Sequence, residues 1–536
     1  MSVPNLDRRT LLASTALLGL GSWAAGCSHV GTPRDTLVQA FAFDDIITMD
    51  PAVSFEVSGG ELLGNTYERL VGLDLEAPGQ VFGVLAQSWQ VSADGLVFSF
   101  QLKPERRFAS GNALTAEDVV FSWQRAVRMN KTPAFILTQL GLTKTNVEER
   151  VRQTGPLTLQ LEISKPFAPS FVLNCLTATV ASVVDKQLLL SKAQGEDLGA
   201  AWLKLNHAGS GPWKLRDWRA NEILVIERNE QFHGDKPSLA RVIYRHVKEA
   251  STQRLLLEKG DVDIARNLAP QDLLALSKSQ QIQLTQTPKG SLYYLGLNQR
   301  HPLLAKPEVR EAFKWLVDYE AIGATLIKGI GLPHQNFLPM GLLGASSERP
   351  FRLDVDRARA LLAKAGLEKG FTVSMDVRSV QPVQGIAEAI QQTAARAGIQ
   401  IEIIPGDGKQ VLTKYRNRRH ELFIGDWGCD YWDPHTNADT FTRNPDNRDD
   451  AKSRPLSWRN SWEIPELTRQ SDAAVLEQDP QRRIQMYESL QAEFRRSSPF
   501  VMIYQQIQVA GVRRQVQGFR IGPTSETTLM APVSKA

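Results

Sequence analysis

Residues 90–103 alternate apolar and polar side chains on both sides of the Asp94-Gly95 pair. An Asp-Gly pair between two period-two runs is the strongest short-range signal for a β-hairpin, so the sequence predicts two antiparallel strands here. A turn is predicted at residues 110–112, and Thr115 stands three residues before Asp118 at the head of an apolar-periodic run. This spacing predicts a helix with a capping box that begins near Thr115 and runs past residue 123.

Strand and helix patterns alternate along two later parts of the chain. Apolar runs of strand length are separated by helix-period segments, and Gly366 and Gly398 each stand where a helix is expected to end. Such alternation is typical of α/β units in which helices cover a mostly parallel sheet. The expected strands are 35–43, 157–163, 223–227, 241–247, 260–264, 293–298, 372–377, 399–404 and 500–504, and the expected helices are 251–258, 307–319, 355–365, 385–397 and 479–494.

The length of 536 residues exceeds the size at which one core stops growing, so at least two domains are expected. The chain is 42% hydrophobic and 22% charged, which is ordinary for a globular protein. A net charge of +4 is too small to indicate a nucleic-acid partner. The one local basic cluster, residues 415–420, is interpreted as a solvated helix face.

The N-terminal residues have the pattern of an export signal. Arg8-Arg9 precede an apolar run that is too short to span a membrane, and small residues lead to Cys27. The arginine pair indicates a twin-arginine signal, with a general secretory signal as the alternative. Cys27 is a candidate for lipidation, although Ala24 replaces the leucine usual in a lipobox, and cleavage to a free periplasmic protein is the alternative.

Three segments together resemble a known family. LAQSWQVSADGLVFSFQL (85–102), RFASGNALTAEDVVFSW (107–123) and GSGPWKL (209–215) are similar to the characteristic segments of the large solute receptors of ABC importers, the oligopeptide, dipeptide and nickel class of family 5. The resemblance implies two α/β lobes joined by a hinge, with an extra domain inserted in lobe I. The boundaries expected from it are 1–27 for the export signal, 28–75, 206–297 and 500–536 for lobe I, 76–205 for the insertion and 298–499 for lobe II, with the hinge at residues 297–302.

The candidate ligand site is the loop at residues 422–437. An apolar strand is expected to end at Gly425 and to be followed by Trp427, Asp430, Tyr431 and Trp432, and ligands of α/β sheets bind beyond the carboxyl ends of strands. The resemblance implies that Asp430 holds the α-ammonium of a peptide, with the aromatic residues as pocket walls. This suits the physics, because a buried ammonium needs a carboxylate and gains from nearby rings. Asp433, before a proline, is expected to make the turn.

The same resemblance implies three further ligand contacts: Tyr67, Asn298 and His334. It also marks a departure, because Ile424 stands where some peptide receptors carry an arginine for the ligand carboxylate. Cys175 and Cys429 would fall in different lobes, so we expect free, buried thiols, with a disulfide as the alternative.

No nucleotide-binding, zinc-protease or nucleophile-elbow motif is found in the sequence, and the spacing of Asp430, Asp433 and His435 matches no standard metal site. The sequence therefore gives no sign of an enzyme, and the resemblance implies a receptor without cofactor or metal. We expect a periplasmic monomer that captures a peptide or peptide-like solute and delivers it to inner-membrane permease subunits. The alternatives are a receptor for a metal chelate or an oligosaccharide, or an exported hydrolase.

Overall fold

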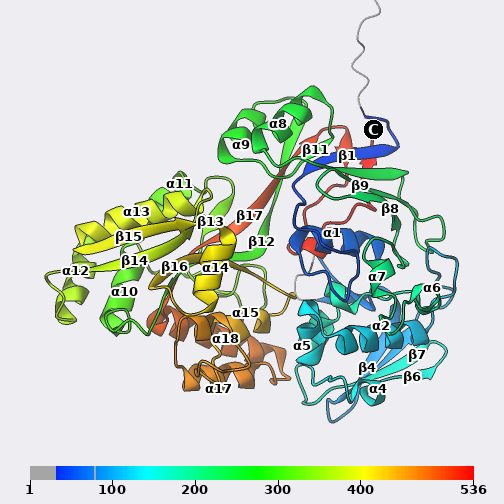
Figure 1. The fold of residues 1–536 in the computed structure, drawn as a ribbon, viewed down its shortest axis with the longest axis horizontal. Helices are drawn as coiled ribbons and strands as arrows, with labels where there is room; N and C mark the ends of the chain where they lie inside the picture. The colour runs from blue at the N-terminus through cyan, green and yellow to red at the C-terminus, as the bar shows by residue number, and fades with distance from the viewer. Residues whose placement is uncertain (1–31, 76, 78–79) are drawn as a thin grey trace, which may run out of the picture.

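The computed structural model describes residues 32–75, 77 and 80–536 and has two lobes, with a further domain beside one of them (Figure 1). The predicted export signal and Cys27 lie outside the described residues. Within the described part of the chain, every helix is too short or too polar to cross a bilayer.

Lobe I occupies the right-hand side of Figure 1. Its first strand, β1 (Thr36–Phe41), is buried along its whole length and lies parallel to β10 (Arg241–His246) and β11 (Ile264–Ala265). Parallel strands buried in this way read as continuous apolar runs. The other elements of the lobe are α1 (Val57–Thr66), β2 (Val71–Leu73), β8 (Trp213–Arg219), β9 (Ile223–Arg228), α8 (Ala250–Lys259), α9 (Pro270–Leu276), β18 (Val516–Gln517), η3 (Ser525–Thr527) and β19 (Ser534–Lys535).

The insertion domain contains the predicted hairpin and capped helix. Strands β4 (Ala86–Val91) and β5 (Val97–Leu102) pair antiparallel around Gly95, whose φ of 72° is easy only for glycine. Helix α2 (Ala116–Met129) begins after Thr115, whose backbone N–H donates to the Asp118 carboxylate at 2.9 Å. Both predictions are confirmed. The remaining elements are β3 (Val81–Gly83), η1 (Thr132–Ala134), α3 (Phe135–Thr138), α4 (Val147–Arg150), β6 (Val151–Gly155), β7 (Thr158–Glu162), α5 (Pro169–Cys175), η2 (Thr179–Ala181), α6 (Lys186–Lys192) and α7 (Ala200–Leu203).

Lobe II shows the predicted alternation of strands and helices. Strand β14 (Phe371–Arg378) lies parallel to β15 (Ile399–Gly406) and to β16 (Leu422–Gly428). Gly366 and Gly398 follow helices and have φ of 74° and 91°, as helix-ending glycines do. The other elements are α10 (Pro307–Trp315), α11 (Tyr319–Ala324), β13 (Gly331–Pro333), α12 (Val355–Lys364), α13 (Val383–Arg396), α14 (Gly408–Arg416), α15 (His435–Phe441), α16 (Leu456–Arg459), α17 (Pro465–Ala474) and α18 (Pro480–Ser497).

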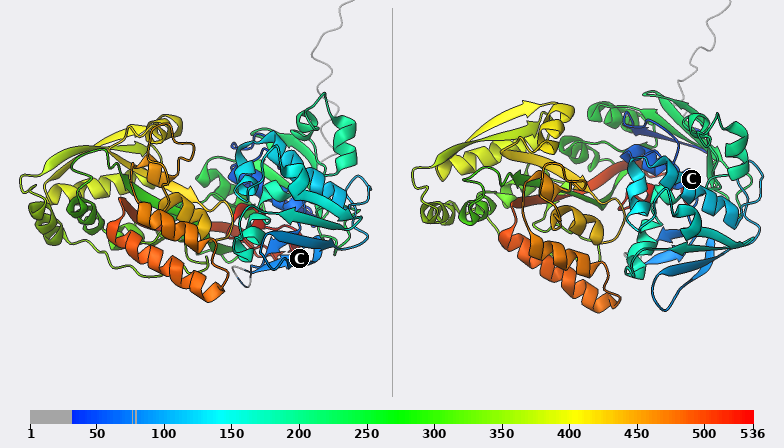
Figure 2. Two further views of the ribbon diagram at one scale, coloured as in Figure 1. Left: turned by 90° about the horizontal axis from the view of Figure 1, so that it is seen from below. Right: turned by 60° about the horizontal axis from the view of Figure 1, so that its bottom comes forward.

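Two long antiparallel strands, β12 (Ile282–Leu297) and β17 (Phe500–Arg513), connect the lobes. They join the strands of both lobes into one sheet with the order β15-β14-β16-β12-β17-β11-β1-β10-β9-β8, and β13 pairs with β17 at its side. Figure 1 shows them crossing the centre of the molecule, and Figure 2 shows the two lobes on either side of this crossing. The predicted bilobed α/β fold is confirmed.

The crossing lies earlier than the hinge predicted at residues 297–302. Ile282 packs in a lobe I core, whereas Leu292 and Leu297 pack in lobe II cores. The pairing of β12 with β17 changes register between Pro288 and Leu292, and such a bulge bends a strand. The strand pairing thus marks residues 288–292 as a second candidate for the hinge, beside the predicted residues 297–302.

Candidate functional site

Strand β16 brings the predicted loop to the boundary between the lobes. It lies between β14 and β12, and residues 422–425 are buried. The strand continues to Gly428, three residues beyond its predicted end, so Asp426 and Trp427 belong to it and project from opposite faces of the sheet. The loop proper spans residues 429–434 and leads into α15.

Asp430 is the most unusual residue of this loop. Its backbone N–H donates to Thr436 Oγ1 at 3.1 Å, but no group among the described residues forms a hydrogen bond or an ion pair with its carboxylate. The side chain remains partly accessible although protein surrounds it. Burial, and to a lesser extent the negative charge of Asp439, raise the pKa of Asp430 to about 7. A deep carboxylate without a counter-charge is suited to a cationic partner.

The three aromatic residues of the loop have different environments. Trp427 is half-buried, whereas Tyr431 and Trp432 are 2% and 3% exposed. Tyr431 packs into the core of the insertion domain, and Trp432 packs into lobe II against Gly290 of the bulge. In this conformation Tyr431 and Trp432 anchor the loop on both sides, and their contact with a ligand stays a prediction. Trp427 keeps enough accessible surface to contact a solute.

Asp433 does more than make the predicted turn. Its Oδ1 accepts from the His435 backbone N–H at 2.9 Å, as a turn residue does. Both of its oxygens also accept from the Arg483 guanidinium, at 2.7 and 2.8 Å, and both side chains are almost completely buried. Bidentate arginine–carboxylate pairs of this kind fix geometry strongly. Asp433 is thus a structural ion-pair partner that holds the loop on α18.

The insertion domain contacts lobe II beside this loop, where Figure 1 shows α5 facing α15 and α17. The Ala168 N–H donates to the Val475 carbonyl at 2.9 Å, and Arg483 donates to Ser170 Oγ at 3.0 Å. The Phe171 ring meets the rings of Tyr431 and His435 edge-on. In the described conformation the insertion domain, expected to be mostly structural, therefore covers one side of the boundary between the lobes.

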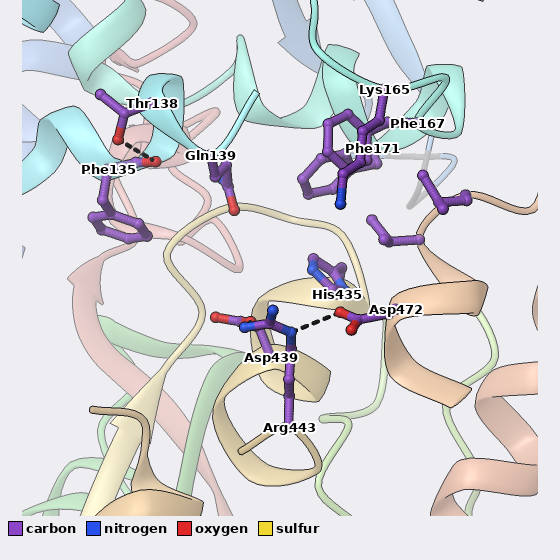
Figure 3. Close-up of a pocket in the computed structure, with 12 residues that line it drawn as sticks. Phe135, Thr138, Gln139, Lys165, Phe167, Phe171, His435, Asp439, Arg443 and Asp472 are labelled. Atoms are coloured by element: carbon purple, nitrogen blue, oxygen red, sulfur yellow. Dashed lines mark hydrogen bonds and ion pairs between the residues drawn. The ribbon is translucent and has the colours of Figure 1, made fainter. Parts of the chain in front are cut away.

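Two cavities lie between the lobes. The first, of about 420 Å³, separates the insertion domain from lobe II (Figure 3). The second, of about 610 Å³, lies at the crossing strands between residues 266–271 of lobe I and residues 325–330 and 381–382 of lobe II. Asp430 is not among the residues that line either cavity, but Asp439, whose charge acts on it, lines the first.

Arg378 is a site candidate that the sequence did not reveal. It ends β14, and its guanidinium donates to Asp426 at 2.6 Å, with both side chains more than a third exposed. Only one of its N–H groups is used there, so others remain for an anion. The sequence contained one signal, because Arg378 directly follows the strand predicted at residues 372–377. Its nearness to Asp426, however, depends on the order of the strands in the sheet.

The other predicted contacts lie elsewhere. Tyr67 is buried in lobe I, where its hydroxyl accepts from the Ala208 N–H at 3.2 Å. The Asn298 amide donates to the carbonyls of residues 418 and 420, and His334 Nε2 lies 2.8 Å from the Leu338 carbonyl. In the described form each of these side chains is buried and bonded within one lobe, and their contact with a ligand stays a prediction.

The cysteines agree with the prediction from sequence, whereas the basic cluster does not. Cys175 and Cys429 are free, as predicted, although Cys429 is only half-buried. No cluster of three or more potential metal ligands occurs within residues 32–75, 77 and 80–536. In the basic cluster of residues 415–420, Arg418 is buried against Asn447 and Trp458, so it is structural and not part of a solvated face.

Comparison with known proteins places this geometry in a family. A model of the bacterial extracellular solute-binding proteins, family 5 (middle region), matches residues 80–449. The chain is 26% identical over 503 residues to the probable D,D-dipeptide-binding periplasmic protein DdpA of Escherichia coli (strain K12), covering 93% of this chain and 94% of that protein. It is 24% identical over 477 residues to the dipeptide-binding protein of the same organism, covering 85% and 86%.

A solved structure has the same fold. The ABC transporter-associated periplasmic binding protein DppA of Helicobacter pylori, in complex with the peptide STSA, superimposes with a TM-score of 0.78 at 22% identity, covering 93% of this chain and 98% of that one. The match over residues 80–449 includes the crossing strand β12 and the Asp430 loop. The chain belongs to the bacterial extracellular solute-binding proteins of family 5.

Proposed function

We propose that this protein is the solute receptor of an ABC importer and that its solute is a peptide or a peptide-like amine. The observation that carries the proposal is the unpartnered carboxylate of Asp430 at the boundary between two lobes. A ligand ammonium would supply the missing charge, and closure around it would exclude water. The names of two relatives, both dipeptide-binding proteins, support the choice of a peptide.

The position of Arg378 favours a ligand that carries both a positive and a negative charge. This arginine pairs with Asp426 near the carboxyl ends of the parallel strands β14 and β16, and both side chains are accessible. A ligand carboxylate could bind the free N–H groups of Arg378 while the ammonium binds Asp430. In this proposal the receptor releases its solute, unchanged, to permease subunits in the inner membrane, and the protein is exported to the periplasm as a monomer.

Binding of short peptides is the direct test. A dipeptide present at a hundred times its Kd should raise the stability of the protein by about 2.7 kcal/mol, seen as a higher melting temperature. Recovery of the peptide intact after long incubation supports a receptor. Multiple turnover of the peptide would instead indicate an exported hydrolase. Detection of a co-purified metal chelate or oligosaccharide by native mass spectrometry would identify that compound, and not a peptide, as the ligand.

Closure of the lobes should be visible in solution. The contacts of residues 168–171 with lobe II belong to the closed form, so the ligand-free protein is expected to open about the bulge at residues 288–292. Small-angle scattering should give a smaller radius of gyration with saturating peptide than without it. An identical radius in both states, with binding shown independently, would contradict hinge closure.

A further inference from the structure

The cavity between the insertion domain and lobe II has two unlike walls. The insertion domain contributes three phenylalanine rings, Phe135, Phe167 and Phe171, and lobe II contributes His435 and a row of charged side chains (Figure 3). Its volume of about 420 Å³ lies within the range of small-molecule sites. Because each wall belongs to a different lobe, the cavity is complete only when the lobes are closed.

The charges that line this cavity cancel. Arg443 donates to Asp472 at 2.7 Å and to Asp439 at 3.2 Å, so one cation serves two carboxylates. Lys165, on the opposite wall, is exposed and supplies the second positive charge. The lining therefore carries no net charge, and an ionic group of the ligand gains little there.

His435 is the polar group that faces the aromatic wall. Its ring is 7% exposed, stands edge-on to Phe171 with centroids 5.2 Å apart, and lines the cavity. Its Nδ1 is buried and has no hydrogen-bond partner in the part of the chain that the structure describes. Burial lowers the pKa of His435, so the imidazole is neutral near pH 7. A neutral ring in the lining suits an uncharged ligand group.

The cavity is close to the proposed ammonium anchor. Asp439 lines it and is near enough to Asp430 for the two charges to interact, and Thr436, next to His435, bonds the Asp430 backbone. A solute held at Asp430 therefore has this cavity within reach of a neighbouring side chain.

We infer that this cavity is a specificity subsite that takes an uncharged aromatic side chain of the solute, packed against the phenylalanine wall beside His435. The inference rests on the proposed function, since it assumes that a peptide-like ligand binds at Asp430. Aromatic pairs favour edge-on and offset contacts of the kind that Phe135 and Phe171 offer. The insertion domain then selects the ligand as well as closing over it.

Calorimetry with the dipeptides Ala-Ala, Leu-Ala, Phe-Ala and Ala-Phe tests the inference. We expect one phenylalanine peptide to bind about tenfold more tightly than Ala-Ala and more tightly than Leu-Ala. Thr138→Trp, which fills the cavity from its rim, should remove this preference and leave Ala-Ala affinity unchanged. Thr145→Trp, on an exposed turn of the same domain, is the matched control.

A second variant guards against misfolding of the first. Phe135→Ala removes part of the wall at a side chain that is already 38% exposed, and Phe82→Ala removes an exposed ring elsewhere. Only Phe135→Ala should weaken binding of the phenylalanine peptide. If all four peptides bind equally, or if neither cavity variant changes the preference, the inference is overturned while the proposed function stands. If none of the four peptides binds, both the inference and the proposed function are overturned.

Discussion

Asp430→Asn should stabilise the ligand-free protein at pH 8 and nearly abolish its affinity for peptides. Folding raises the pKa of this carboxyl from near 4 to about 7, so the folded protein holds the proton more tightly than the unfolded chain. The ionised side chain therefore destabilises the empty protein, by an amount that grows between about pH 4 and pH 7 and is constant above. The substitution should add on the order of 3 kcal/mol to the free energy of unfolding at pH 8, and nothing below pH 4.

The same substitution removes the proposed counter-charge of the ligand. Loss of one partner of a desolvated charge pair costs on the order of 2–5 kcal/mol in binding, so the Kd should rise by a factor of at least thirty or so. In the unmodified protein, peptide affinity should increase about fivefold from pH 6 to pH 7, because Asp430 becomes half ionised while the peptide α-ammonium stays largely protonated. This dependence should vanish in Asp430→Asn.

Denaturation and calorimetry, each across the pH range given for it, check both halves of the prediction. Asp450→Asn, which removes the same charge from a side chain 80% exposed in lobe II, is the control and should change neither quantity. Peptide binding by Asp430→Asn within twofold of the unmodified protein would show that this carboxylate is not the ligand anchor.

Breaking the pair between Asp433 and Arg483 should cost about 3–5 kcal/mol of stability. Each single change, Asp433→Asn or Arg483→Met, leaves the other group buried with altered partners, and burial of an uncompensated charge is what makes such changes costly. The double variant Asp433→Asn with Arg483→Met leaves no charge and keeps an oxygen for the His435 N–H, so it should lose less than the sum of the two.

Urea unfolding of the two single variants and the double variant measures this coupling. Ser170→Ala is the matched control, because it removes the hydroxyl that Arg483 reaches in the insertion domain and leaves the ion pair intact. This substitution should affect the closing of the lobes more than the free energy of unfolding. Single variants that unfold within about 1 kcal/mol of the unmodified protein would contradict a structural role for the pair.

The local elements of this protein and its resemblance to the family could be predicted from the amino-acid sequence alone. The hairpin around Gly95, the helix after Thr115 and the strands and helices of lobe II all rest on turn chemistry, capping and hydrophobic period, which act over a few neighbouring residues. The same local order of residues placed Asp430 in a loop beyond a buried strand. Its lack of a partner was not visible there.

The environments and partners of the loop residues depend on the tertiary structure. Tyr431 and Trp432 are adjacent and similar in type, yet they pack into cores on opposite sides of the boundary between the lobes. Asp433 meets an arginine 50 positions later, and Arg378 meets a carboxylate 48 positions later. The register shift between β12 and β17, where the strands cross between the lobes, likewise depends on the pairing of distant segments. The physical reason is that burial and charge pairing depend on which distant segments meet, and a local pattern carries no information about that partner.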